Sequence, residues 1–535
     1  IVGAYAAAAR RTMEGDLDGV EVIAYGHLVD QFWTPLVNRR TDRYGGSLEN
    51  RMRFSMEVLE AIRREVGDDY IVGIRMSGSE DQTGGLDQDE LTEIARQLVA
   101  SGMIDFVNVV RGWIASDEAL SHVIPNLGTP LGPHLPLAAA IKEAVDVPVF
   151  HAARITDLET ARHAVEQGLV DMVGMTRAHM ADPYIVEKLK AGRAAEIRSC
   201  VGASYCLNRL YLGQEALCIQ NPATGREEHI PHVVGRSAEP GRKVVVVGGG
   251  PAGMEAARVS ARRGHEVVLF EAAHELGGQI NLAARAIERR RELIGIVDWL
   301  AAAIEREGVQ VRLNTYADAA TVTAESPDVV VVATGGEPNF NFLEAGHHLV
   351  DSTWDVIAGA VRPRGRVLVY DDHGGDQAMS TAERLALAGH EVAVVTPDRV
   401  AGHDVPGTLY PAYLKVFYEH DVALIPDLRL IRVDRKGDQL AGSFLNEYTG
   451  VTSEMTAAHI VVEHGTSPLD EVYTELRERS SNRGEIDIPA LLAGQPQALA
   501  RNPEGSYQLF RVGDAVASRN IHAALYDSLR LCMAL

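Results

Sequence analysis

Residues 1–190 alternate short apolar runs with longer amphipathic segments. The apolar runs are rich in valine and isoleucine, and the longer segments repeat apolar residues at the spacing of one helix face. Such alternation is typical of parallel α/β units. We predict strands at Gly19–Ala24, Tyr70–Met76, Ile104–Val110, Val147–Ala152 and Asp171–Met175, and helices that include Glu49–Val66, Asp89–Ser101 and Asp157–Gln167.

Unusual polar side chains follow the carboxyl ends of these strands. Functional groups at that end of successive parallel strands are typical of a (β/α)8 barrel, whose active site lies there. The pattern gives only five strands, and the chain opens inside a helical pattern at VGAYAAAARR. We therefore expect the first three barrel units to be absent, with overlooked strands as the alternative. The strand-end residues are Tyr25, His27, Arg75, Asn108, Arg111, His151, Arg154, Thr176 and Arg177.

The rest of the chain divides into further parts. Residues 191–240 are irregular, hold three of the four cysteines and end in the linker GRSAEPGRK. Strand–turn–helix units then begin at RKVVVVGGGPAG and at GRVLVYDDHGG, and the tail RVGDAVASRN returns to the pattern of the first unit. The predicted domains are 1–190, 191–240, 241–345 together with 465–535, and an inserted domain over 346–464.

The first of these units carries a dinucleotide-binding pattern. Gly248, Gly250 and Gly253 form GxGxxG between an apolar strand and a helix, and Glu271 ends the next strand at the spacing of a ribose-binding acid. The glycines let a pyrophosphate approach the N–H groups of the helix. A glycine-rich turn without a ligand is the alternative. We expect an adenine-dinucleotide domain of the flavoprotein disulfide-reductase type, with further cofactor residues at Gly278, Gln279 and Asp514.

The inserted domain has an acidic loop, YDDHGGD, where a nicotinamide-binding loop would be rich in glycine. Asp371, Asp372 and Asp376 would face the pyrophosphate and repel it. We expect this degenerate NAD(P)-type domain to keep its fold while its phosphate site is lost.

Composition narrows the class of protein. Lys and Arg number 51 against 74 Asp and Glu, a formal net charge of −23 that disfavours nucleic acid and anionic membranes as partners. No apolar run is long enough to span a bilayer, and the first residues lack a basic leader and a cleavage site. Four cysteines in 535 residues favour a reducing compartment over a disulfide scaffold. We expect a cytoplasmic enzyme.

A family resemblance rests on NRRTDRYGGSLENR at 38–51, on the cysteine cluster and on GGGPAG. The chain resembles the NADH:flavin oxidoreductase superfamily related to Old Yellow Enzyme, whose multidomain members include trimethylamine dehydrogenase and 2,4-dienoyl-CoA reductase. The demethylase subgroup that acts on N-methylproline and dimethylglycine is most similar, through YGHLVDQFW, VIPNLGTP, VFHAARITD, GMTRAHMADP, CVGASYCLNR and NPATGRE. The resemblance covers essentially the whole chain. It implies the last five strands of an FMN-binding TIM barrel, an iron–sulfur segment and two Rossmann-like domains, the first binding FAD or ADP.

The resemblance also implies roles for residues of the barrel. Arg75 matches the arginine that contacts the flavin pyrimidine ring, where a cation stabilises negative charge on reduced FMN. The family usually has glycines in the two turns that hold the FMN phosphate, and this chain departs from that pattern. The matching phosphate residues are Ala153, Arg154, Thr176 and Arg177, with ordinary surface arginines as the alternative reading of the cations.

The acid–base positions differ from those of the reductases. Dienoyl-CoA reductases carry His-Gly-Tyr where this chain has Tyr25, Gly26 and His27, and their partner histidine matches Ile114. The first tyrosine of the trimethylamine dehydrogenase triad matches Val22. Reduction of an activated C=C needs a proton donor, whereas amine oxidation needs an unprotonated amine close to the flavin. We expect an aromatic, weakly basic amine pocket, with plain packing as the alternative. Its residues would be Tyr25, His27, Trp113 and His122.

The relatives hold a cluster with the spacing C-x2-C-x2/3-C-x11-C. This chain keeps the spacing with Cys200, Cys206 and Cys218 but has Ala203 in place of the second ligand. Three thiolates can hold a [3Fe-4S] cluster, or a [4Fe-4S] cluster whose remaining iron takes another ligand. Thiols without metal, or zinc with an unidentified fourth ligand, are the alternatives. We expect an iron–sulfur relay, with [4Fe-4S] favoured, and a buried structural thiol at Cys532.

Together these features predict an FMN-dependent oxidative N-demethylase of a small N-methylated amino acid. Hydride would pass from the N-methyl group to flavin N5, and the iminium would hydrolyse to an amine and formaldehyde. Electrons would then leave through the cluster to an electron-transfer flavoprotein or ferredoxin. An NAD(P)H-dependent ene-reductase or 2,4-dienoyl-CoA reductase is one alternative, and an inactive barrel remnant with a binding domain is another. A homo-oligomer is compatible with the sequence.

Overall fold

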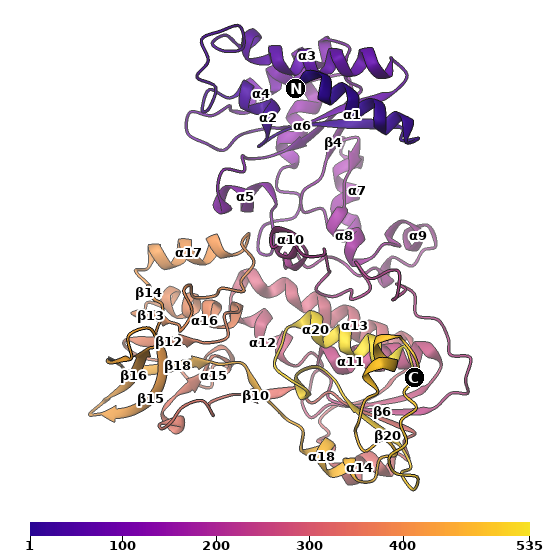
Figure 1. Cartoon of the computed structure of the whole chain (residues 1–535), viewed down its shortest axis with the longest axis vertical. Helices are drawn as coiled ribbons and strands as arrows, with labels where there is room; N and C mark the ends of the chain where they lie inside the picture. The colour runs from indigo at the N-terminus through magenta and orange to yellow at the C-terminus, as the bar shows by residue number, and fades with distance from the viewer. The chain divides into compact units, whose positions relative to one another are not determined.

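The structure, a computed structural model, describes residues 1–535 and divides into two compact units, 1–179 and 180–535 (Figure 1). The first unit contains one sheet, and the second unit contains the others. No helix in either unit is both long enough and apolar enough to cross a membrane.

The sheet of the first unit is parallel throughout. Its strands are β1 (Gly19–Ala24), β2 (Ile71–Ser77), β3 (Phe106–Val110), β4 (Val149–His151) and β5 (Met172–Val173). They lie side by side in chain order, so each crossover returns to the neighbouring position of the sheet. All five predicted strands are confirmed, although β3, β4 and β5 are shorter than expected. Pro148 has no N–H group for the ladder, which fits the start of β4 at the next residue.

The three helices predicted for this unit are confirmed to within one residue at either end. The residue before each helix is Ser47, Asp87 or Asp157, and its side chain accepts a backbone N–H from the first turn of that helix. The helices of the unit are α1 (Val2–Glu14), α2 (Leu28–Trp33), α3 (Leu48–Val66), α4 (Gln88–Ala100), α5 (Asp117–Val123), α6 (Leu135–Ala144), α7 (Leu158–Glu166) and α8 (Thr176–Ala181), the last of which continues into the second unit.

Alternate side chains of β2 lie in the apolar core of the first unit. Val72, Ile74 and Met76 are fully buried in one apolar cluster with residues of α3 and α4. Because successive side chains of a strand point to opposite faces, Arg75 lies on the other face of the sheet.

The second unit begins with helices and turns around the cysteines and continues into a parallel sheet. The strands of this sheet are β6 (Lys243–Val247), β7 (Glu266–Phe270), β8 (Gln310–Arg312), β9 (Val329–Val332) and β20 (Gln508–Arg511). Their order is β20-β9-β6-β7-β8, so a strand from the end of the chain completes the sheet. Three helices, α11 (Pro251–Arg263), α13 (Ile294–Arg306) and α20 (Ile521–Cys532), lie together beside it (Figure 1).

A second parallel sheet is inserted between β9 and β20. Its strands are β11 (Asp351–Ser352), β18 (His459–Glu463), β12 (Val367–Asp371), β13 (Val392–Val395) and β14 (Ala423–Ile425), in that order across the sheet. An antiparallel sheet of β15 (Arg429–Lys436), β16 (Gln439–Asn446) and β17 (Val451–Ala457) lies beside it (Figure 1). A short pair, β10 (Gly336–Pro338) with β19 (Thr466–Pro468), joins the segments that enter and leave the insertion.

The remaining helices of the second unit are mostly short. They are α9 (Ile185–Lys190), α10 (Tyr205–Tyr211), α12 (Gln279–Ala286), α14 (Ala319–Ala324), α15 (Thr353–Ala358), α16 (Asp376–Leu387), α17 (Tyr410–Glu419), α18 (Glu471–Arg477) and α19 (Ile488–Leu492). Short 3-10 helices cover Ala194–Glu196, Glu288–Leu293, His347–Leu349 and Gly513–Ala515.

Candidate cofactor and active site

The loop after β6 allows helix α11 to approach it closely. Gly248 has a φ of +106°, in the left-handed region that favours glycine. A Cβ atom on Gly253 would lie 1.8 Å from the carbonyl oxygen of Gly248, so only glycine allows this packing. A Cβ atom on Gly250 would meet nothing within 4 Å. The loop therefore has open space at Gly250, next to the first N–H groups of α11.

Glu271 is fixed at the carboxyl end of β7. Its carboxylate accepts the Gly249 N–H at 2.6 Å and the Ala273 N–H at 2.7 Å. These two bonds hold the acid beside the glycine loop, where a dinucleotide site needs an acceptor for ribose hydroxyls.

Gly278, Gln279 and Asp514 come from two distant segments that the fold brings together. The side-chain amide of Gln279 donates to Asp514 Oδ2 at 3.0 Å. Gly278 has a φ of +52°, and a Cβ atom there would lie 3.1 Å from the Cα of Gly250. The residues predicted for the dinucleotide therefore gather around the glycine loop, at the carboxyl ends of the strands of this sheet.

The corresponding loop of the inserted sheet is filled by a carboxylate of its own. Asp371 is fully buried and accepts the Gly374 N–H at 2.9 Å and the Gly402 N–H at 2.8 Å. Burial raises the pKa of Asp371, and the N–H groups of Gly402 and Gly374 oppose that rise. These N–H groups are thus already bonded within the protein.

The other two carboxylates of this loop also have partners. Asp372 Oδ2 lies 2.7 Å from His464 Nδ1. Asp376 forms an ion pair with Arg290 at 2.5 Å and accepts the hydroxyl of Tyr413 at 2.9 Å. The acidic loop is therefore stabilised by the inserted domain and its neighbours without any ligand.

In the first unit, Arg75 is oriented by an acid on the neighbouring strand. Its Nε lies 2.7 Å from Glu21 Oε1, and Glu21 Oε2 accepts the side-chain amide of Asn108 at 2.7 Å. The side chain of Arg75 remains 34% exposed. Glu21 thus links three adjacent strands and holds the guanidinium in one direction while leaving it accessible.

The turns after β4 and β5 lie against each other. A Cβ atom on Gly174 would lie 2.6 Å from the Cβ of Ala152. Arg154 has a φ of +50°, which a residue other than glycine rarely adopts, and its Nε donates to the Thr129 carbonyl at 2.5 Å. A strained conformation at a strand end is a feature of functional turns.

Arg177 tests whether an FMN phosphate fits these turns. Its Nη1 is buried and has no hydrogen-bond partner. Ala153 is buried beside the strained turn, whereas Thr176 is exposed at the start of α8. A buried guanidinium N–H without an acceptor is unfavourable unless an anion meets it. The chemistry of these residues therefore fits a bound phosphate.

Tyr25 and His27 flank Gly26 in the turn after β1, with their ring centroids 6.1 Å apart. Gly26 has a φ of +62°, and a Cβ atom there would lie 2.2 Å from Cγ1 of Ile114. The loop after β3, which also carries the partly buried Trp113, therefore packs against this turn. The apolar side chain of Ile114, which the resemblance matches to a histidine of the reductases, therefore packs against the turn that holds Tyr25 and His27.

Two other positions have different surroundings. His122 lies on α5 with its side chain 55% exposed, and its Nε2 is 3.4 Å from Glu118. This exposed pair favours a surface role for His122 over a pocket role. Val22, in the tyrosine position of the amine dehydrogenase triad, is buried within β1.

Backbone N–H groups are directed at the cysteine sulfurs. None of the cysteines forms a disulfide. Gly202 N lies 3.4 Å from Cys200 Sγ, and the N–H groups of Gln220 and Asn221 donate to Cys218. Burial raises the pKa of the Cys218 thiol to about 11, while those two N–H groups lower it. An iron-bound thiolate would gain from the same N–H groups.

The three cysteines are soft sulfur donors of the kind that iron–sulfur clusters use. No group of three or more His, Cys, Asp or Glu side chains is placed to hold a single metal ion. A cluster spreads soft thiolates over several irons, and hydrogen bonds to its sulfurs tune it. Cys200, Cys206 and Cys218 offer three such sulfurs, and Ala203 offers no donor atom.

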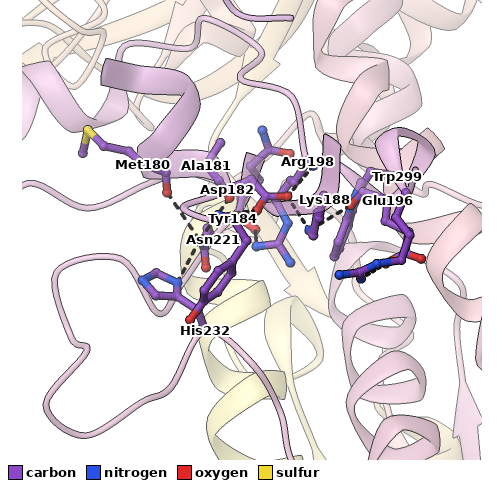
Figure 2. Close-up of polar contacts among 12 residues, drawn as sticks. Met180, Ala181, Asp182, Tyr184, Lys188, Glu196, Arg198, Asn221, His232 and Trp299 are labelled. Atoms are coloured by element: carbon purple, nitrogen blue, oxygen red, sulfur yellow. Dashed lines mark hydrogen bonds and ion pairs between the residues drawn. The ribbon is translucent and has the colours of Figure 1, made fainter. Parts of the chain in front are cut away.

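A polar network holds the segments on either side of the cysteines together (Figure 2). Asp182 Oδ2 accepts the backbone N–H of Arg198 at 2.9 Å and pairs with Lys188 at 2.5 Å. The side-chain amide of Asn221 donates to the Ala181 carbonyl at 3.0 Å. Residues before the first cysteine are thus bonded to residues just after the last one, so the fold fixes the cysteine segment.

His522 and Arg226 also support this segment, and the sequence analysis missed both. His522 Nδ1 donates to the carbonyl of Cys218 at 2.7 Å, across 304 positions of the chain. Arg226 Nη1 donates to His522 Nε2 at 3.1 Å. Burial lowers the pKa of His522 to about 4, so the imidazole is neutral. A histidine in the apolar helix IHAALYDSL is the sole sequence signal, and it equally suits a packed core.

Comparison with protein families gives two matches. Residues 1–196 match the NADH:flavin oxidoreductase / NADH oxidase family. Residues 242–492 match the pyridine nucleotide-disulphide oxidoreductase family. The first match contains the Arg75 site, and the second contains the glycine loop and the inserted sheet.

Comparison with individual proteins extends these matches over the whole chain. The chain is 50% identical over 531 residues to a probable N-methylproline demethylase of Rhizobium meliloti, covering 99% of this chain and 78% of the relative. It is 48% identical over 545 residues to an N,N-dimethylglycine/sarcosine dehydrogenase of Chromohalobacter salexigens, again covering 99% and 78%. A solved complex of 2-naphthoyl-CoA reductase with 2-naphthoyl-CoA has a TM-score of 0.84 at 28% identity, covering 100% of this chain and 76% of that one. The resemblance carried by the motifs is confirmed.

Proposed function

We propose a function from the premise that this chain belongs to the NADH:flavin oxidoreductase / NADH oxidase family and is an oxidoreductase. We propose that it acts as an FMN-dependent oxidative N-demethylase of a small N-methylated amino acid of the N-methylproline or dimethylglycine kind. Identities of 50% and 48% to proteins named for such substrates support the substrate class.

The packing of Ile114 against Gly26 is the observation that favours a demethylase over a reductase. A reductase of C=C bonds needs a proton donor beside the flavin. Here the usual tyrosine–histidine pair is missing, because His27 stands in the tyrosine position and the aliphatic Ile114 in the position of the partner histidine. An amine oxidation has no such requirement, because the substrate itself gives up hydride and proton.

FMN, when bound, supplies a hydride acceptor, so that the N-methyl carbon is oxidised to an iminium that water hydrolyses to an amine and formaldehyde. The chain's own residues prepare the substrate. The imidazole of His27 can accept the ammonium proton, which frees the nitrogen lone pair. Tyr25 and Trp113 offer aromatic faces that attract a cationic amine as it enters. Arg75, held by Glu21, places positive charge where the flavin ring gains negative charge.

We assign the remaining cofactors by the residues that would hold them. The sheet of β1–β5 is part of an FMN-binding barrel, with Ala153, Arg154, Thr176 and Arg177 at the phosphate. The glycine loop and Glu271 hold FAD or ADP. The cysteine segment holds an iron–sulfur relay that serves an electron-transfer flavoprotein or ferredoxin, and the internally bonded Asp371 loop disfavours NAD(P)H as a partner. Free thiols are compatible with a cytoplasmic location.

An anaerobic titration of the purified flavoprotein tests the proposal. N-methylproline or dimethylglycine should bleach the flavin absorbance and release formaldehyde. Proline, which lacks the N-methyl group, is the matched control and should do neither. NADH and NADPH should reduce the flavin slowly or not at all.

The alternative function is an NAD(P)H-dependent ene-reductase or 2,4-dienoyl-CoA reductase, which the likeness to a solved naphthoyl-CoA reductase keeps in view. Rapid bleaching by NADPH, followed by reoxidation with an enone or dienoyl-CoA and no response to N-methyl amines, would establish that alternative and reject the demethylase.

A further inference from the structure

Arg198 is a buried cation with no carboxylate of its own. It is 8% exposed, its Nε has no hydrogen-bond partner, and no acidic side chain forms an ion pair with it. Two acids, Glu255 and Asp182, interact electrostatically with Arg198. They already form ion pairs with Arg258 at 2.7 Å and with Lys188 at 2.5 Å, respectively. This part of the protein therefore buries one more positive charge than negative charge. Such an excess is unfavourable unless an anion lies nearby.

The guanidinium is held in place on its apolar side and through the backbone (Figure 2). Its Cζ lies 3.8 Å from the ring centroid of Trp299, a cation–π contact. Its backbone N–H donates to Asp182 Oδ2 at 2.9 Å. The charge is thus fixed inside the protein and is not free to turn toward solvent.

A single residue, Gln220, connects this cation to a cysteine sulfur. The carbonyl of Gln220 accepts Arg198 Nη1 at 3.0 Å, and the N–H of Gln220 donates to Cys218. Cys200 follows Arg198 by two positions in the sequence. The unpaired cation is therefore connected to Cys218 through one residue and precedes Cys200 by two positions in the chain.

We propose that Arg198 is the positioned counter-charge of the iron–sulfur relay and raises its reduction potential. This inference rests on the relay assigned under the proposed function. A thiolate-bound cluster is anionic and gains one more negative charge on reduction, so a nearby buried cation stabilises the reduced form more than the oxidised form. Arg198 is a positioning and tuning residue, because it supplies no ligand atom to iron.

The test is a redox titration of the holoprotein, with the cluster followed by electron paramagnetic resonance. Arg198→Gln removes the charge and keeps a hydrogen-bonding side chain. At a fixed solution potential, the ratio of reduced to oxidised cluster should fall at least about tenfold, which is a shift of about 59 mV for a one-electron couple. Arg198→Lys keeps the charge and should retain most of the potential.

Arg193→Gln is the matched control, because Arg193 lies in the same segment but is 51% exposed and pairs with Glu196 at 2.9 Å. Solvent and salt screen that charge, so the potential should not change. A normal potential in Arg198→Gln that retains its cluster would overturn the inference.

A loss of the cluster in Arg198→Gln would leave Arg198→Lys to decide. If the lysine variant keeps the wild-type potential, the charge is what matters. If the reduction potential of the lysine variant falls as far as that expected for Arg198→Gln, the inference fails. Wild-type protein that lacks iron and acid-labile sulfide would instead reject the relay itself. The demethylase function is tested separately, by the release of formaldehyde from N-methyl amines.

Discussion

Gly250 and Gly253 belong to one glycine pattern, yet alanine at each position should have a different effect. Gly253→Ala would place a methyl group 1.8 Å from the Gly248 carbonyl oxygen, whereas real Cβ atoms essentially never come closer than 3.0 Å. Helix α11 or the loop must move by roughly 1 Å, and overpacking of this kind costs about 1–3 kcal/mol. We expect Gly253→Ala to lower the free energy of unfolding of the cofactor-free protein by about that amount.

Gly250→Ala meets no neighbour within 4 Å and has a φ of −70°, which any residue adopts. Without ligand, this variant should be as stable as the wild type or more stable by about 0.4–1 kcal/mol, since alanine restricts the unfolded chain. The added methyl group stands where a pyrophosphate would approach α11. We expect FAD or ADP to bind at least about tenfold more weakly, a loss of about 1.4 kcal/mol.

The assay combines denaturant unfolding of cofactor-free protein with a binding titration of FAD and ADP on the same samples. The expected pattern is a stability loss with Gly253→Ala and an affinity loss without a stability loss with Gly250→Ala. Wild-type affinity in Gly250→Ala would show that the pyrophosphate does not lie on this loop. Unchanged stability in Gly253→Ala would refute the packing argument.

Two further predictions concern the other cofactors. Cys206→Ala should remove most of the bound iron and acid-labile sulfide, whereas Cys532→Ala, at a buried thiol outside the cluster motif, should retain both; zinc without sulfide would contradict the relay. Arg75→Ala should lower FMN retention or the rate of flavin reduction about tenfold or more, because it removes the cation beside the flavin ring. The exposed Arg162→Ala is its control, and full FMN content with a full reduction rate in Arg75→Ala would show that the barrel alignment is wrong.

The fold of the first unit could be predicted well because its strands and helices are locally encoded. The strand at Gly19–Ala24 was predicted to the residue, and the helix ending at Val66 stops at Gly67, whose φ of +80° suits a helix end. The last strand was predicted over Asp171–Met175 but is only Met172–Val173. It has a single neighbour, β4, so the ladder can extend no further than that short strand allows.

The contacts that build the sites could not be predicted in the same way. The bond between Gln279 and Asp514 joins residues 235 positions apart, and nothing local in either segment specifies the other. The loop at Asp371 was expected to repel a phosphate, which is a statement about charge alone. In the structure, this carboxylate accepts N–H groups from Gly374 and from Gly402, 31 positions away. Long-range pairing of this kind depends on the completed fold.

The proposed direction of electron flow is supported by two independent departures from a reductase. An NAD(P)H-dependent reductase needs a loop that binds the nicotinamide nucleotide and a proton donor at the substrate. In the second unit, Asp371 accepts the Gly374 N–H of that loop and the N–H of Gly402, and in the first unit Ile114, at the position matched to the partner histidine of the reductases, packs against Gly26. Neither observation depends on how the two units are arranged. Both departures support the proposed function, in which the flavin receives its electrons from an amine oxidised at its N-methyl carbon.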